Sequence, residues 1–187
     1  LPNRGRRRVV AVLNRAPADA PVARHTHPGD GFLFERGFTV ASIGWQWDVY
    51  RSDVLMGLDA PCAMRDGVAV RGQSMVEIRP GERVDTWLLA DRTHRPMPAL
   101  AGAQPDAVLY VRDFEDGDDS VVARERWRFA RRTDSGVLET SAEHVHLEGG
   151  FDPGRIYQLV YETDHAPLAG LGLLALRDVA PFLRSSS

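Results

Sequence analysis

The sequence contains no lysine and only one cysteine, and it has no long hydrophobic run. Cys62 has no second cysteine with which to form an internal disulfide, and it lacks the Cys and His spacing of a zinc site. No apolar stretch approaches the roughly 20 residues of a membrane-spanning helix, and the basic residues 1–8 precede only a short apolar segment. We therefore predict neither a membrane span nor a signal peptide, and we expect a cytoplasmic protein.

All 23 basic residues are arginines, scattered among 26 acidic residues with a net charge of −3. They make no basic face, so nucleic acid is not an expected partner. The 187 residues are 43% hydrophobic and 26% charged, which is ordinary globular usage and enough for a sizeable core. This composition excludes disorder, collagen and coiled coil. Because the first residue is Leu1, we expect that a preceding segment has been removed.

Two apolar runs near the start predict a pair of parallel strands. Residues 9–13 (VVAVL) are continuously apolar, as in a strand buried on both faces. Residues 38–45 form a second run, and residues 28–37 between them predict a short helix that ends at a glycine. Ligands of such crossover units bind at the carboxyl ends of the strands. The residues at these ends are Asn14, Arg15, Trp45, Gln46, Trp47 and Asp48.

From about residue 67 to 162 the chain changes to short β runs separated by turn residues. In residues 121–129, alternation places Trp127 and Phe129 on one strand face and three arginines on the other. Six such runs predict an antiparallel sandwich or a β-rich insertion. They cover residues 67–79, 83–90, 107–114, 121–131, 138–149 and 155–163. Residues 167–184 return to helical spacing, with Pro181 as a point of kinking or restart.

No serine has the Gly-x-Ser-x-Gly surroundings that hold the nucleophile of a crossover-type serine hydrolase. Ser74 lacks the second glycine, and Ser42 lacks the first. Both lie inside predicted strands rather than at a strand-to-helix turn. We therefore interpret them as ordinary strand serines.

Two His-x-His pairs resemble metal-binding patterns. The pairs are His25/His27 and His144/His146. The second pair shares one strand face, but a metal site needs at least three converging ligands. Glu148 follows too closely for cupin spacing, and His165 is isolated. We predict exposed strand histidines, no metal site and no other cofactor.

Two further motifs have simple structural interpretations. The acidic residues around Gly117, in residues 113–119, lack the spacing and the closing glutamate of an EF-hand and predict a solvated hairpin tip. Gly170-x-Gly172 precedes a helix but lacks the third glycine and the strand of a dinucleotide-binding motif. Close packing of the helix explains these glycines.

Residues 45–48 (WQWD) are the most informative segment, because two tryptophans, an amide and a carboxylate at a strand end are costly to bury or expose. Two interpretations stay open for this segment. The side chains line a substrate pocket, or the rings cover the junction with the β-rich part.

Four segments, taken together, carry a family resemblance. They are VVAVLNR, HPGDGFLFERGFTVASIGWQWDV, GLDAP and FDPGRIYQLVYETDHAPLAGLGLLALRDVAPFL. This succession resembles the amino-terminal half of a bacterial family of esterase-like α/β-hydrolase proteins, whose members pair a GWQ-D segment with a PGRIYELVY...GLG..A.RD segment. In that family a β-rich insertion separates the early strands from the helix before the nucleophile elbow. The elbow, the acid and the histidine of the triad then follow.

The resemblance implies an α/β fold: a partial α/β-hydrolase sheet (strand-helix-strand), a large β-rich insertion and a C-terminal helix. The implied divisions are 1–66 (N-terminal part of the hydrolase core), 67–163 (insertion) and 164–187 (helix leading back to the core). It also implies an oxyanion-hole N–H from Asn14, Arg15 or Ala16 and a pocket rim at residues 45–48. Because the chain ends before the elbow would begin, we expect no catalytic residue in it.

Two functions follow as hypotheses. The leading one is the amino-terminal portion of a serine-dependent carboxylic ester hydrolase for a small-molecule ester. Its triad would lie on a C-terminal half, present as a second chain or a missing segment, and the reaction would be acyl transfer to water. The alternative is a non-catalytic β-rich binding module for carbohydrate or a protein partner, since the chain has no complete catalytic constellation.

Overall fold

The computed structural model describes residues 8–13, 32–36, 38–52, 55–92, 94–102 and 104–185. The chain divides into two compact units. The first consists of residues 1–61 and 167–187, and the second, called the β-rich unit below, is Cys62–Ala166. The boundaries implied by the sequence were after residues 66 and 163.

The first unit contains a parallel strand pair and a long helix. Strand β1 (Arg8–Leu13) pairs in parallel with β2 (Phe38–Ile43), and the single-turn helix α1 (Phe32–Glu35) precedes β2. The predicted parallel pair and the short helix between its strands are therefore present. Helix α2 (Leu171–Ser185) lies within the predicted helical segment at the C-terminal end and continues through Pro181.

The second glycine of Gly170-x-Gly172 permits close packing of α2, as predicted. A Cβ atom at Gly172 would lie 1.9 Å from the carbonyl oxygen of Trp45, so no side chain fits there. At Gly170 the equivalent point has no atom within 4 Å. The first turn of α2 therefore packs directly on the backbone that follows β2.

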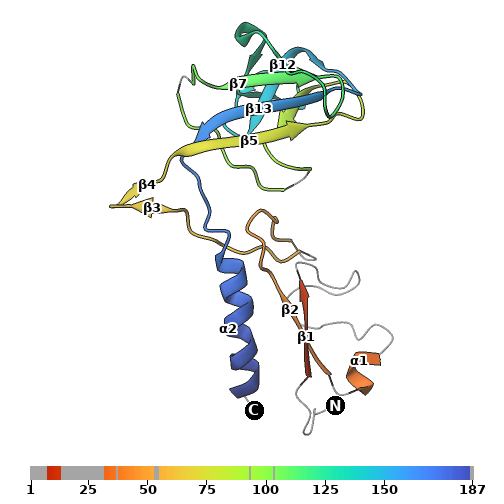
Figure 1. Cartoon of the computed structure of the whole chain (residues 1–187), viewed down its shortest axis with the longest axis vertical. Helices are drawn as coiled ribbons and strands as arrows, with labels where there is room; N and C mark the ends of the chain where they lie inside the picture. Colours follow the sequence, from red (N-terminus) through yellow and green to blue (C-terminus); the bar gives the residue numbers. More distant parts are fainter. Residues whose placement is uncertain are drawn as a thin grey trace. The chain divides into compact units, whose positions relative to one another are not determined.

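The β-rich unit is built from antiparallel strands (Figure 1). The strands are β3 (Met64–Arg65), β4 (Val68–Ala69), β5 (Gly72–Ile78), β6 (Val84–Leu88), β7 (Val108–Arg112), β8 (Ser120–Val121), β9 (Trp127–Arg128), β10 (Ala130–Arg132), β11 (Leu138–Thr140), β12 (His144–Phe151) and β13 (Ile156–Thr163). One sheet has the order β5-β13-β7-β8 and another the order β6-β12-β9. Two small pairs, β3-β4 and β10-β11, complete the described strands of the unit.

The core of the β-rich unit takes its side chains from both larger sheets. Ile78, Leu109 and Leu159 come from the first sheet and are fully buried. Val145 and Phe151 come from β12 in the second sheet and are also fully buried. Buried residues alternate along β5 and along most of β13, and these side chains share an interior with Val145 and Phe151 of β12, as in a sandwich of two sheets.

The predicted α/β fold class is wrong. In the described part of the chain, the strand-helix-strand order of β1, α1 and β2 does not recur, and the remaining strands pair antiparallel. A parallel sheet of the hydrolase type needs repeated strand–helix units that cover both of its faces. From residue 62 onward, two-residue alternation interrupted by turns forms antiparallel ladders instead. The protein is mostly β.

One predicted strand, residues 121–131, is interrupted. It forms part of β8, the 3-10 turn η1 (Arg124–Arg126), β9 and part of β10. The Arg124 guanidinium donates to the carbonyl oxygen of Trp127 at 2.6 Å and lies 4.0 Å from the centre of its indole ring. This turn buries Trp127 to 2% exposure while Val121 stays 66% exposed. The two residues therefore do not share a strand face.

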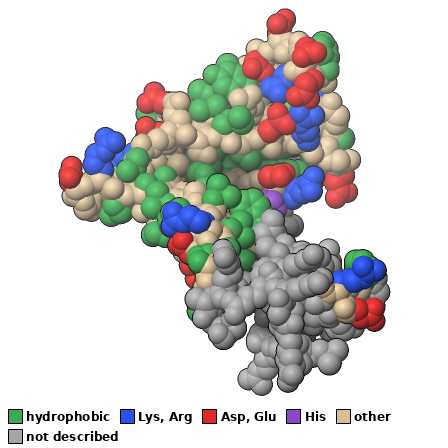
Figure 2. Space-filling model, turned by 60° about the horizontal axis from the view of Figure 1, so that its bottom comes forward, with side chains coloured by type: hydrophobic (Ala, Val, Ile, Leu, Met, Phe, Trp, Pro, Cys, Tyr) green, Lys and Arg blue, Asp and Glu red, His purple; other side chains and the backbone are tan. Residues whose placement is uncertain are grey.

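The acidic segment 113–119 joins β7 to β8 and is the predicted hairpin tip. Its carboxylates contact arginines from other segments, with Asp113 bound to Arg155 at 2.7 Å and Glu115 to Arg79 at 2.6 Å. Figure 2 shows basic and acidic side chains interspersed on one face of the molecule. No helix in the described ranges is long and apolar enough to cross a membrane.

Candidate functional site

The oxyanion-hole candidates lie outside the described residues. These are Asn14, Arg15 and Ala16, and the first histidine pair, His25/His27, also lies outside. The prediction of an oxyanion hole therefore stays a prediction.

Residues 45–48 begin two positions after the end of β2, and all four are partly buried. The chain folds back tightly after them, because the Leu58 N–H donates to the Gln46 carbonyl at 2.9 Å. A Cβ atom at Gly57 would lie 2.0 Å from the Val49 carbonyl oxygen. These contacts give the segment a packing role. Its predicted role as the rim of a substrate pocket stays a prediction.

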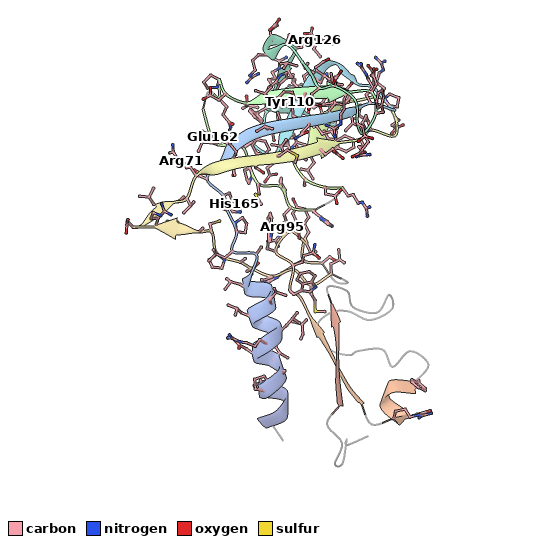
Figure 3. The ribbon with its side chains drawn as sticks, viewed as in Figure 1. Arg71, Arg95, Tyr110, Arg126, Glu162 and His165 are labelled. Atoms are coloured by element: carbon pink, nitrogen blue, oxygen red, sulfur yellow. The ribbon has the colours of Figure 1, made fainter. Side chains whose placement is uncertain are left out.

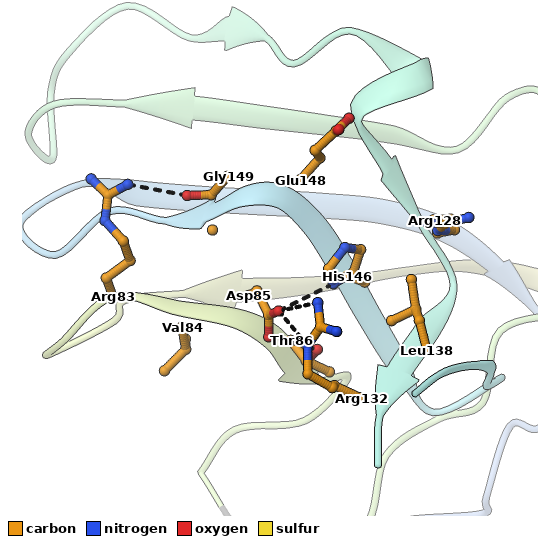
Figure 4. A pocket seen from close by; sticks show the side chains of 11 residues that line it. Arg83, Val84, Asp85, Thr86, Arg128, Arg132, Leu138, His146, Glu148 and Gly149 are labelled. Atoms are coloured by element: carbon orange, nitrogen blue, oxygen red, sulfur yellow. Dashed lines mark hydrogen bonds and ion pairs between the residues drawn. The ribbon is translucent and has the colours of Figure 1, made fainter. Parts of the chain in front are cut away.

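An open cleft lies on the β-rich unit beside β6, β9 and β12 (Figure 4). Its volume is about 1000 Å³, and side chains from five strands and the residue before β6 line it. The charged and imidazole side chains among them are Arg83, Asp85, Arg128, Arg132, His146 and Glu148. In the sequence, His146 and Glu148 belong only to a metal-ligand pattern and Arg128 only to three arginines on one strand face, and no pattern groups the six residues.

A β-bulge in β12 shapes the cleft. The pairing of β12 with β6 is interrupted between His146 and Phe151. Gly149 and Gly150 lie in this gap with φ of 85°, a conformation that favours glycine. Extra residues on one strand bend it and increase its local twist. The consecutive glycines within a β run are the sequence signal for this feature.

Asp85 is the centre of the polar network in the cleft. Its Oδ2 atom lies 2.6 Å from both Nε and Nη2 of Arg132 and 3.9 Å from Nδ1 of His146. The Thr86 hydroxyl donates to Oδ1 at 3.2 Å. The hydrogen bond from Arg132 lowers the pKa of Asp85 below its ordinary value, so the carboxylate is ionised at neutral pH. The Arg132 charge is therefore already neutralised.

His146 is buried at the wall of the cleft, with 7% of its surface exposed. Its Nδ1 atom has no hydrogen-bond partner in the described part of the chain, since 3.9 Å to Asp85 exceeds a hydrogen bond. The prediction of exposed strand histidines is wrong here. The reason is that β9 pairs with β12 at His146 and β10 contacts the same strand.

The three arginines of the cleft differ in their ion pairs. Arg83 is paired with Asp152, and Arg132 with Asp85. Arg128 is exposed, and no described carboxylate forms an ion pair with it. Its guanidinium is therefore available to an anion from solution.

A second cavity of about 300 Å³ adjoins the cleft and shares three lining residues with it. The shared residues are Arg128, His146 and Glu148. The η1 turn supplies the remaining charged side chains, from residues 124–126. The strand segment that carries His146 thus borders both cavities.

His144, the other member of the pair, is partly buried and hydrogen-bonded to Ser141, with 3.1 Å between Nδ1 and the hydroxyl oxygen. Burial lowers the pKa of His144 below its ordinary value, which favours a neutral imidazole. A serine nucleophile also needs an oriented base and oxyanion donors. The Ser141–His144 contact spans one short turn, and no described carboxylate hydrogen-bonds to this imidazole.

The described residues contain no group of three or more His, Cys, Asp or Glu side chains that could hold a metal ion. The Cys62 sulfur lies 3.1 Å from Nδ1 of His165, although the two are 103 positions apart. His165 is therefore not isolated in the fold. No local sequence pattern signals a contact over this separation.

Comparisons with protein-family models, with curated proteins and with solved structures found no match to this chain. The resemblance to esterase-like proteins therefore stays a prediction.

Proposed function

We propose that the β-rich unit is a non-catalytic binding module that holds a carboxylate-bearing carbohydrate in its cleft. The observation that carries this proposal is the exposed Arg128 guanidinium, which has no described ion-pair partner although its neighbours Arg83 and Arg132 do. A guanidinium binds a carboxylate through two parallel hydrogen bonds. Such a pair gives the ligand both affinity and a defined orientation.

The acidic side chains of the cleft favour a ligand that also has hydroxyl groups. Asp85 and Glu148 line the cleft and accept hydrogen bonds. They would repel a ligand that carries negative charges without hydrogen-bond donors, whereas hydroxyls donate to them. A sugar acid supplies a carboxylate for Arg128 and hydroxyls for these acceptors, in a site with few precisely placed polar groups.

The ester hydrolase hypothesis stays a prediction without a site in the described residues. The fold on which it depended is wrong, and its oxyanion candidates lie outside the described ranges. Its ester substrate and its C-terminal partner half also stay predictions. The binding module requires neither, so it is the function that the described residues support best.

The test is isothermal titration calorimetry of the full chain with trigalacturonate and with the neutral trisaccharide maltotriose. We expect trigalacturonate to bind and maltotriose not to bind. Arg128→Ala should weaken binding about tenfold, the effect of losing a charge-assisted hydrogen-bonded pair.

Arg71→Ala is the matched control. Arg71 is exposed, has no described ion-pair partner and lies outside both cavities, so its loss removes the same charge from elsewhere on the unit (Figure 3). Circular dichroism checks that each variant is folded. Absence of trigalacturonate binding, or equal weakening by the two variants, would refute the proposal.

A further inference from the structure

We propose that the ligand is a linear acidic oligosaccharide that extends from the cleft into the second cavity, so that the module has two subsites. This inference rests on the proposed function. The two cavities share Arg128, His146 and Glu148 as a common wall. Ligand sites typically have volumes of about 300–1,000 Å³. Each cavity is therefore of a size that holds part of a ligand.

The charge pattern of the second cavity continues that of the cleft. Arg124, Arg126 and Arg128 alternate along η1 and β9, and no described carboxylate pairs with any of them. Arg126 donates to the carbonyl oxygen of Glu148 at 3.1 Å, and Arg124 donates to that of Trp127. A carbonyl oxygen orients a guanidinium without neutralising its charge. The three arginines thus provide positive charge over both cavities.

Acidic side chains between these arginines favour a polymer that offers hydroxyl donors beside its negative charges. Glu125 lines the second cavity, and Glu148 lines both. A nucleic acid carries a phosphate on every nucleotide, so some of its phosphates would face these carboxylates. An acidic peptide has few hydroxyls to donate to them. An oligogalacturonate also carries a carboxylate on every ring, but each ring has free hydroxyls that donate to Glu125 and Glu148, so it can satisfy both the arginines and the carboxylates.

The test is calorimetry of the full chain with galacturonate, digalacturonate and trigalacturonate. We expect affinity to rise at least about tenfold from the monomer to the trimer, because the longer ligand gains a charge-assisted contact in the second cavity. Arg126→Ala should remove this gain, so that the trimer binds the variant no more tightly than the monomer does. Arg126→Gln keeps a hydrogen-bond donor near the Glu148 carbonyl but removes the charge, so it should also remove the gain. It controls for any loosening of η1 by the alanine substitution. Arg71→Ala should behave as the unmodified chain.

The outcomes separate this inference from the proposed function. Equal affinity for all three lengths, or a trimer that is insensitive to both Arg126 variants, overturns the second subsite and leaves the first. Tighter binding of a single-stranded thymidine oligomer or of polyglutamate overturns the ligand class. If no galacturonate of any length binds, both the inference and the proposed function fail.

Discussion

Replacing Gly172 by alanine should destabilise the first unit, although alanine is favoured over glycine in helix interiors by about 1 kcal/mol. The new Cβ would lie 1.9 Å from the carbonyl oxygen of Trp45 and 2.9 Å from the carbonyl carbon. Both atoms belong to the backbone, so no side chain can rotate away. Helix α2 and the segment that follows β2 must instead move apart.

The magnitude follows from this separation. A carbon and a carbonyl oxygen normally approach to about 3.3 Å or more, so the two segments must separate by more than an ångström. Overpacking of this kind costs about 1–3 kcal/mol, and a backbone clash belongs at the upper end. After subtraction of the helix-propensity gain, we expect a net loss of about 2 kcal/mol in the free energy of unfolding.

The assay is urea unfolding followed by far-ultraviolet circular dichroism, together with amide hydrogen exchange of α2. Gly170→Ala is the matched control, because its Cβ would have no atom within 4 Å. A substitution in open space should change stability by no more than about 0.5 kcal/mol. The prediction is wrong if the two variants have the same free energy of unfolding, or if the α2 amides exchange as slowly in Gly172→Ala as in Gly170→Ala.

Three other predictions concern the β-rich unit. The Tyr161 hydroxyl donates to the Met97 carbonyl at 2.7 Å, so Tyr161→Phe should cost about 1–2 kcal/mol in urea unfolding. Burial raises the pKa of Tyr161, so the phenol keeps its proton in the folded state at a pH where the unfolded chain loses it. The free energy of unfolding should therefore fall as pH rises above about 10, and it should fall less in the phenylalanine variant. The hydrogen bond from Arg132 lowers the pKa of Asp85 in the folded state. The ionised Asp85 carboxylate therefore stabilises the fold above the ordinary pKa of 3.8, and this stabilisation is lost as pH falls through the lower, folded pKa. Because the Asp85 side chain is 38% exposed, this stabilisation should be less than about 1 kcal/mol. It is measured as the difference in the acid-dependent loss of unfolding free energy between the unmodified chain and Asp85→Asn, and a larger difference would contradict the weak contribution expected of an exposed ion pair. A fluorophosphonate probe should leave the chain unmodified in intact-mass analysis, because neither the binding module nor the hydrolase hypothesis places a nucleophile in this chain; a label on Ser141 would contradict both.

Several elements were predictable because neighbouring residues determine them. Strands β5, β6, β7 and β13 lie inside the predicted β runs, and α2 lies within the segment of helical spacing. Residues 121–131 were misassigned because the side chain of Arg124 binds the Trp127 backbone and forms a turn. Alternation alone does not distinguish such a turn from a strand.

The candidate cleft was not predictable from these patterns. Asp85 lies on β6, Arg128 and Arg132 lie on the adjacent short strands β9 and β10, and His146 lies on β12, so the cleft combines three separate segments of the chain. The sheet order β6-β12-β9 and the bulge at Gly149 and Gly150 bring them together. The His144/His146 pair was interpreted as exposed strand histidines, whereas His146 is buried in the wall of the cleft.

By itself, the sequence determined the strand-forming segments, the hairpin tip at residues 113–119, the α2 helix and the parallel pairing of β1 with β2. The strands, the tip and the helix depend on alternation and turn residues, which act over a few neighbouring residues, and the parallel pairing follows from the strand-helix-strand order. Only the tertiary structure decided the mostly β class, the burial of His146 and which arginines are neutralised. These properties depend on which strands pair and on which charges lie within a few ångströms, and a linear sequence does not specify such distances.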